Sequence, residues 1–229
     1  MMDLTRRSDD SILRAQFTTG LRRSSAGRRW FGVPVVALVC SAGGLEPLCE
    51  ILADLPRRFP AAVIVLRHQS PTAADRMAPI LRARTALRVK TAADGDALVP
   101  GRVLVAPAGN HTLVSPDGMI TLIDSGERPP YRPSADLLLT TLAMAAGPRA
   151  IAVVLSGYGN DGATGASVIH RLGGVVIASD AATSPVFAMP QAAIERDAVV
   201  DHVVPVGAIA ALLQSLAERV IDASGPAAG

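Results

Sequence analysis

Residues 33–44 read VPVVALVCSAGG, an apolar run that ends in small residues and two glycines. The run from 33 to 39 has the length of a strand and contains no polar residue, which is typical of a strand buried on both faces of a parallel sheet. The segment that follows, 45–55, is helix-like. A buried strand, a glycine turn and a helix in succession form half of a βαβ unit, so this stretch favours an α/β fold.

The same alternation continues along the chain. Further strands are expected at 62–66, 103–106, 151–156 and 175–178, with an extended segment at 199–203. Helices are expected at 73–84, 134–146, 163–172, 188–196 and 209–221. The segments 111–114 and 119–123 flank Pro116-Asp117-Gly118, which predicts a hairpin. The sequence therefore predicts a three-layer α/β/α sandwich with a mostly parallel sheet and a small antiparallel hairpin.

Composition bounds the organisation and the function. The chain has 229 residues, of which 49% are apolar and 18% charged, enough for one large domain, expected at 33–221. Residues 1–32 are polar and rich in arginine and are expected to be a disordered arm, and 222–229 a disordered tail. A net charge of +2 and 3% aromatic residues argue against a nucleic-acid partner. Two cysteines and four scattered histidines indicate neither a disulfide framework nor a metal site.

The start of the apolar run admits an export signal as an alternative. Arg28-Arg29 precede it and Cys40 follows it, an order typical of twin-arginine or lipoprotein signals. The run is too short to span a bilayer, and Val39 stands where a cleavage site requires a small residue. We therefore expect a cytoplasmic protein with no membrane insertion.

Polar residues follow three of the predicted strands. Ser41 lies just after the first, His68 after the second, and Asp161 after the strand at 151–156. Ligands of such sheets bind beyond the carboxyl ends of the strands, and a serine at a strand-to-helix turn can act as a nucleophile beside a histidine base. Triads are recognised by geometry rather than chain order, so these three residues form one candidate site. A phosphate-binding turn or a tight turn without chemistry is the alternative for the Ser41 loop.

A second interpretation applies to the loop at 157–162, which reads GYGNDG. Gly157, Gly159 and Gly162 match G-x-G-x-x-G after a strand, and Asp180 ends the next strand. This is the fingerprint of a dinucleotide-binding turn. Asp161 argues against it, because its charge lies inside the turn that would contact pyrophosphate.

Several spaced motifs, in order, carry a resemblance to a known family. Between about 33 and 213 the chain resembles the catalytic domain of the bacterial chemotaxis protein-glutamate methylesterases (CheB type). The motifs are Ser41-Ala42-Gly43-Gly44, the loop around His68, Asp94-Gly95, Pro100-Gly101, Ala106-Pro107 before His111, Arg132-Pro133-Ser134, Leu155-Ser156-Gly157, Asn160-Asp161-Gly162-Ala163, Gly173-Gly174 and Met189-Pro190. The resemblance implies a cytoplasmic serine hydrolase that removes methyl esters from glutamates on the cytoplasmic helices of methyl-accepting chemoreceptors, with glutamine deamidation as a second reaction, in chemotaxis adaptation.

The resemblance also implies a role for each site residue. Ser41 is the expected nucleophile, His68 the acid and base, and Asp161 the group that orients His68. Ala42, Tyr158 and Met189 are expected at the oxyanion and substrate site, and no cofactor or metal is required.

The chain departs from the family where Val39, Ala42 and Tyr158 replace Gly, Thr and Met. These departures make a non-catalytic signalling homologue a further alternative. About 33 residues precede the first strand, so we expect no receiver domain, which takes roughly 100 residues or more. The oligomeric state stays open.

Overall fold

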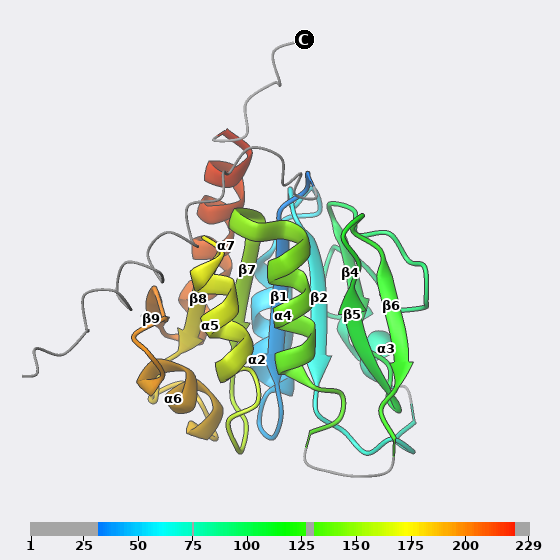
Figure 1. The fold of residues 1–229 in the computed structure, drawn as a ribbon, viewed down its shortest axis with the longest axis horizontal. Helices are drawn as coiled ribbons and strands as arrows, with labels where there is room; N and C mark the ends of the chain where they lie inside the picture. Colours follow the sequence, from blue (N-terminus) through cyan, green and yellow to red (C-terminus); the bar gives the residue numbers. More distant parts are fainter. Residues whose placement is uncertain (1–31, 75, 127–130, 223–229) are drawn as a thin grey trace, which may run out of the picture.

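The fold is built on a parallel sheet, shown in Figure 1 for a computed structural model that describes residues 32–74, 76–126 and 131–222. Seven strands form the sheet in the order β3-β4-β2-β1-β7-β8-β9, and every neighbouring pair is parallel. The strands are β1 (Val35–Cys40), β2 (Ala62–Arg67), β3 (Arg88–Thr91), β4 (Arg102–Val105), β7 (Ala150–Val154), β8 (Val175–Ser179) and β9 (His202–Val204).

Apolar side chains on both faces of the sheet create two cores. In β1, Val35, Ala37 and Val39 point into one buried cluster and the residues between them into the other. The first core packs against α4 (Ala135–Ala146), α5 (Ala163–Arg171) and α6 (Ala188–Glu195). The second packs against α2 (Leu45–Asp54), α3 (Met77–Arg82) and α7 (Val206–Asp222). Figure 1 shows α4 and α5 in front of the sheet and α2 behind it, so the predicted three-layer sandwich is confirmed.

The predicted hairpin is also present and lies on the α4 side. Strands β5 (Asn110–Val114) and β6 (Ile120–Asp124) pair antiparallel around the predicted turn. Gly118 has φ +78° in this turn, a conformation that favours glycine. Val114 N–H donates to Thr141 Oγ1 of α4 at 3.1 Å, which ties the hairpin to the helix layer.

The order of the strands creates one switch point, where the chain changes the direction in which it adds strands. From β1 it adds β2 and then β4 on one side, and it later returns to β7 on the other side of β1. The loops after β1 and β7 therefore leave neighbouring strands at the carboxyl edge of the sheet. Open α/β sheets bind their ligands at such a point.

The structure differs from the sequence-based expectations in three elements. Strand β3 was not predicted, because Arg88 and Lys90 alternate with apolar residues on a short edge strand, where charge is common. Helix α3 begins at Met77 rather than at residue 73, because the preceding residues form turns, with Ala73 N–H donating to the Ser70 carbonyl. Helix α7 starts three residues before the expected position and ends at Asp222.

The two predicted terminal segments fall almost entirely outside the described residues. Of the expected arm only Gly32 is described, and of the expected tail only Asp222. No helix in the described ranges has both the length and the apolar character needed to cross a bilayer.

Candidate active site

The Ser41 loop leaves the end of β1 through a glycine turn. Ser41 N–H donates to the Ser156 carbonyl at 2.9 Å, and Gly44 N–H donates back to the Ser41 carbonyl at 3.2 Å. The left-handed residue of the turn is Gly43, with φ +74°. Among the described non-glycine residues only Asp197 and Ala198 have positive φ, so Ser41 lies on unstrained backbone. A strained serine elbow requires a glycine two residues before the serine. Because the backbone of Ser41 is not strained, Val39 can occupy that position.

Cys40 precedes Ser41 and packs directly beneath the turn. A Cβ on Gly44 would lie 2.4 Å from the Cβ of Cys40, so glycine is needed at position 44. Burial raises the pKa of the Cys40 thiol to about 12, with the nearby Arg67 opposing this rise. Since the thiolate is the nucleophilic form, Cys40 is a buried apolar residue and not a rival to Ser41.

His68 lies beside Ser41 because their strands are neighbours. Its N–H donates to the Cys40 carbonyl at 3.0 Å, and Cys40 pairs with Arg67 in the register of β1 and β2. Ser41 and His68 thus occupy the next position of this register. The imidazole is nearly buried, and its Nε2–H donates to Asp161 Oδ2 at 2.8 Å.

Tyr131 covers the imidazole from one side. The rings of Tyr131 and His68 stack with centroids 5.3 Å apart and planes 25° apart. The Tyr131 hydroxyl donates to Asn160 Oδ1 at 3.1 Å and lies 2.4 Å from where a Cβ on Gly159 would stand. Tyr131 therefore links the ring of His68 to the loop that carries Asp161.

Asp161 is held as a buried anion. Its side chain is 2% exposed and accepts hydrogen bonds from the N–H groups of Ala135 at 2.6 Å and Asp136 at 2.9 Å, besides the bond from His68. Ser134 Oγ donates a further bond at 3.1 Å. Burial alone would raise the pKa of Asp161, but the bonds from His68 and these N–H groups outweigh it and hold the pKa below the usual value.

An aspartate at the start of each of α4 and α5 accepts hydrogen bonds from the N-terminus of the other helix, an arrangement called here the exchange of aspartates. Asp161, just before α5, accepts from the first N–H groups of α4. In return, Asp136 Oδ1 of α4 accepts from Gly162 N–H at 2.9 Å and Gly165 N–H at 2.7 Å. Each carboxylate also lies at the positive end of the partner helix. This exchange fixes Asp161 relative to both helices.

The same exchange argues against the dinucleotide interpretation. The N–H groups that a pyrophosphate would use at the start of α5 already donate to Asp136. Asp180, the expected ribose ligand, instead accepts from Thr183 N–H at 2.9 Å and from the Thr183 hydroxyl. The glycines of this turn serve close packing, since a Cβ on Gly159 would lie 2.4 Å from the Tyr131 hydroxyl and one on Gly157 2.2 Å from Met189 Sδ.

The loop after β7 closes over the Ser41 loop. Ser156 Oγ donates to the Ala42 carbonyl at 2.8 Å and accepts from Val186 N–H at 2.9 Å. A Cβ on Gly157 would lie 2.7 Å from Ser41 Cβ and 2.2 Å from Met189 Sδ. Met189 is 1% exposed and shapes the wall behind Gly157, and its expected contact with the substrate stays a prediction.

Two backbone donors near Ser41 are available to a substrate. Within the ranges that the structure describes, the N–H groups of Ala42 and Tyr158 have no hydrogen-bond acceptor. Ala42 directly follows Ser41, the usual position of an oxyanion donor. Tyr158 is 68% exposed and directly follows Gly157, which packs against Ser41.

The structure thus brings His68 and Asp161 into contact and places Ser41 at the neighbouring strand end. In the described part of the chain Ser41 Oγ makes no hydrogen bond to His68, so this contact stays a prediction. The described residues contain no group of three metal-ligating side chains. Sequence reasoning did not identify Tyr131, Asp136 or Ser156 as parts of the site. For Ser156 a signal existed, because it is a polar residue at the end of a wholly apolar strand.

Fold and site together define a three-layer α/β protein with serine, histidine and aspartate at the carboxyl edge of a parallel sheet. The family model described as CheB methylesterase matches residues 36–213. The chain belongs to this family, which confirms the resemblance. The crystal structure of the Thermotoga maritima CheB methylesterase catalytic domain has a TM-score of 0.76 and 35% identity, covering 80% of this chain and 98% of that one.

Curated relatives agree with this assignment. The chain is 39% identical over 180 residues to the protein-glutamate methylesterase FrzG of Myxococcus xanthus, covering 79% of this chain and 54% of FrzG. It is 41% identical over 195 residues to a protein-glutamate methylesterase/protein-glutamine glutaminase of Anaeromyxobacter dehalogenans, covering 85% of this chain and 57% of that protein. The chain therefore spans about half the length of the curated relatives it matches.

Proposed function

We propose that this chain is a serine hydrolase that removes methyl esters from glutamate side chains of chemoreceptors, with glutamine deamidation as a second reaction of the same site. The observation that carries the proposal is the buried His68–Asp161 pair next to Ser41. Family membership and the printed names of the relatives support the substrate class. The N–H groups of Ala42 and Tyr158, which have no acceptor among the described residues, support acyl chemistry because they can bind a developing oxyanion.

The proposed reaction uses the two nitrogens of His68 for different tasks. Asp161 accepts from Nε2–H, which leaves Nδ1 as the base for Ser41 Oγ. Ser41 attacks the side-chain carbonyl of the methyl glutamate, and the N–H groups of Ala42 and Tyr158 bind the oxyanion. Methanol leaves with the proton from His68, and water then hydrolyses the acyl-serine by the reverse route. Asp161 stabilises the imidazolium in both steps.

The proposed partners are the cytoplasmic helices of methyl-accepting chemoreceptors, so we expect the protein to act in the cytoplasm. The exposed Tyr158 gives such a helix an apolar contact at the mouth of the site. Amide and ester substrates share the same acyl intermediate, which is why one site serves both reactions.

The test measures methanol released from the methylated cytoplasmic fragment of a receptor. The wild-type chain is expected to release methanol, and Ser41→Ala to lose roughly 10³-fold or more of the rate. The matched control is Ser215→Ala, the same change on the exposed face of α7, which is expected to keep the wild-type rate.

Two outcomes would reject the proposal. Equal methanol release by wild type and Ser41→Ala would assign the chemistry to another residue. A folded wild-type protein that releases no methanol and no ammonia from the receptor would favour the non-catalytic homologue.

A further inference from the structure

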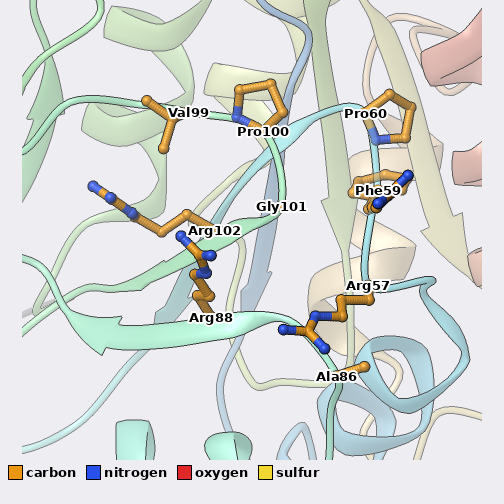
Figure 2. A pocket seen from close by; sticks show the side chains of 10 residues that line it. Arg57, Phe59, Pro60, Ala86, Arg88, Val99, Pro100, Gly101 and Arg102 are labelled. Carbon is orange, nitrogen blue, oxygen red and sulfur yellow. The ribbon is translucent and has the colours of Figure 1, made fainter.

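The amino-terminal edge of the sheet, opposite the Ser41 site, carries a hollow rich in arginine. Its volume is about 710 Å³, within the range of small-molecule pockets, and its walls include Arg57, Arg58, Arg88 and Arg102. Figure 2 shows the side chains of Arg57, Arg88 and Arg102 around this space. Since 21 of the 22 basic residues of the chain are arginine, the choice of arginine over lysine carries no information. The observation that matters is that four arginines line one hollow.

Two of the arginines are forced together by the sheet. Arg88 begins β3 and Arg102 begins β4, and the two are direct partners in the parallel register. Like charges at such positions repel each other and destabilise the pairing. Neither has a carboxylate within ion-pair distance among the described residues. Asp96 interacts electrostatically with Arg102, but its carboxylate already accepts a hydrogen bond from Lys90 Nζ at 2.8 Å.

Backbone contacts fix the opposite wall against these strands. Gly101 N–H donates to the Ala61 carbonyl at 3.1 Å, and Arg88 N–H donates to the Gly101 carbonyl at 3.2 Å. A Cβ on Gly101 would lie 3.4 Å from the Arg57 carbonyl, so the loop that carries Arg57 and Arg58 packs closely on this turn. Their guanidinium groups also lack a carboxylate partner in the described ranges.

We propose that this hollow binds a compact anion with a diphosphate group, either free or as part of a small organic molecule. A phosphate monoester carries about −1.5 to −2 charges at neutral pH, and a diphosphate, whose two phosphates share an oxygen, carries roughly −3, so it offsets most of the charge of four guanidinium groups. Guanidinium forks bind phosphate oxygens in pairs, and the anion would remove the repulsion between Arg88 and Arg102. Apolar surface from Pro60 and Pro100 on the walls suits the organic part of a ligand. The net charge of +2 and the confinement of these arginines to one hollow argue against a nucleic acid.

The test titrates the full chain with pyrophosphate, ADP and inorganic phosphate by calorimetry at low salt. We expect saturable binding of one diphosphate, at least tenfold tighter than phosphate and weaker at higher salt. The double variant Arg88→Gln/Arg102→Gln is expected to lose at least tenfold in affinity. The control Arg171→Gln removes one exposed arginine on α5, which pairs with Asp197 at 3.6 Å, and is expected to bind like wild type.

The arms of the experiment separate the possible sources. Tighter binding of ADP than of pyrophosphate identifies an organic diphosphate, and equal binding identifies the diphosphate group alone. No saturable binding at millimolar pyrophosphate or ADP, or equal losses in the double variant and in Arg171→Gln, would overturn the proposal. Binding of a polyglutamate peptide in place of either diphosphate would also overturn it, because the hollow would then be a docking surface for an acidic protein. Methyl ester hydrolysis should be unchanged in all of these variants.

Discussion

At the scale of single residues, the site depends on one carboxylate whose charge is fixed by its surroundings. Asp161 is buried, yet it accepts bonds from His68, from two backbone N–H groups and from the Ser134 hydroxyl. The same contacts that lower the pKa of Asp161 also determine which nitrogen of His68 carries the proton. Asparagine cannot reproduce this arrangement, because one of its two terminal atoms is a donor.

Asp161→Asn is therefore expected to lower turnover of a methyl ester by roughly 10³–10⁴-fold, since His68 loses its orienting anion. An amide in this place leaves at least one N–H group at the start of α4 without an acceptor, which costs about 1–3 kcal/mol of stability. Turnover and urea unfolding would be measured beside Asp180→Asn, an aspartate outside the triad. Comparable losses of turnover in the two variants would contradict the assigned role.

His111 gives the fold a dependence on pH. It accepts the Ser134 N–H at Nδ1, 2.9 Å away, and burial lowers its pKa below the usual 6.5, against the opposing charges of Asp161 and Asp124. Between the unfolded and folded pKa values the unfolded chain binds the proton and the folded chain does not. Stability from His111 is therefore complete above about pH 6.5 and falls as the pH decreases below it.

We expect His111→Asn, which keeps an acceptor near the Nδ1 position, to reduce this dependence. Urea unfolding of wild type and variant at pH 7.5 and at pH 5.5 measures it. The wild type should lose more unfolding free energy between the two pH values than the variant does. An equal loss in both proteins would show that His111 is not responsible.

At the scale of elements, the exchange of aspartates between α4 and α5 positions the site. Asp136 Oδ1 accepts the bonds from Gly162 N–H and Gly165 N–H, and the Thr164 side chain also bonds to this carboxylate. Burial and the neighbouring Asp161 raise the pKa of Asp136. The folded state therefore binds a proton at Asp136 more tightly than the unfolded chain does, and ionisation at higher pH weakens the fold. Asp136 therefore stabilises the fold through its acceptor atom and not through its charge.

Asp136→Asn is accordingly expected to change stability by less than about 1 kcal/mol at neutral pH, because Oδ1 remains as the acceptor. Asp136→Ala leaves the N–H groups of Gly162 and Gly165 unpaired and is expected to cost about 2–4 kcal/mol. Chemical unfolding of the two variants checks the difference. Equal costs for asparagine and alanine would mean that the charge, which both variants lack, and not the acceptor holds α5.

At the scale of the whole molecule, the local sequence pattern predicted the helices and strands but not which of them lie side by side. Apolar runs and glycine turns located six of the seven sheet strands, and the three strand-end loops held Ser41, His68 and Asp161 as expected. Strand β3 was missed because it has only four residues, of which Val89 alone is buried, so the alternation is too short to be recognised. The order of the strands in the sheet depends on packing between distant segments, which no single stretch of sequence determines. Tyr131 could not be foreseen for the same reason, since it reaches His68 only across the folded chain.

The whole molecule also separates two edges of one sheet. The carboxyl edge holds the Ser41 site, and the amino edge holds the arginine hollow. Because β2 runs six residues between these edges, roughly 20 Å of rigid sheet lies between the two sites. Substitutions in one site therefore make no direct contact with the other site.

The central claim is that Ser41 is a nucleophile activated by His68 and Asp161, and a fluorophosphonate probe tests it most directly. Peptide mass spectrometry of the labelled full chain is expected to find the adduct on Ser41. The labelling rate should fall by roughly 10²-fold or more in His68→Ala, because the general base is lost. An adduct on any other residue, or a Ser41 adduct that forms at the same rate without His68, would contradict the account.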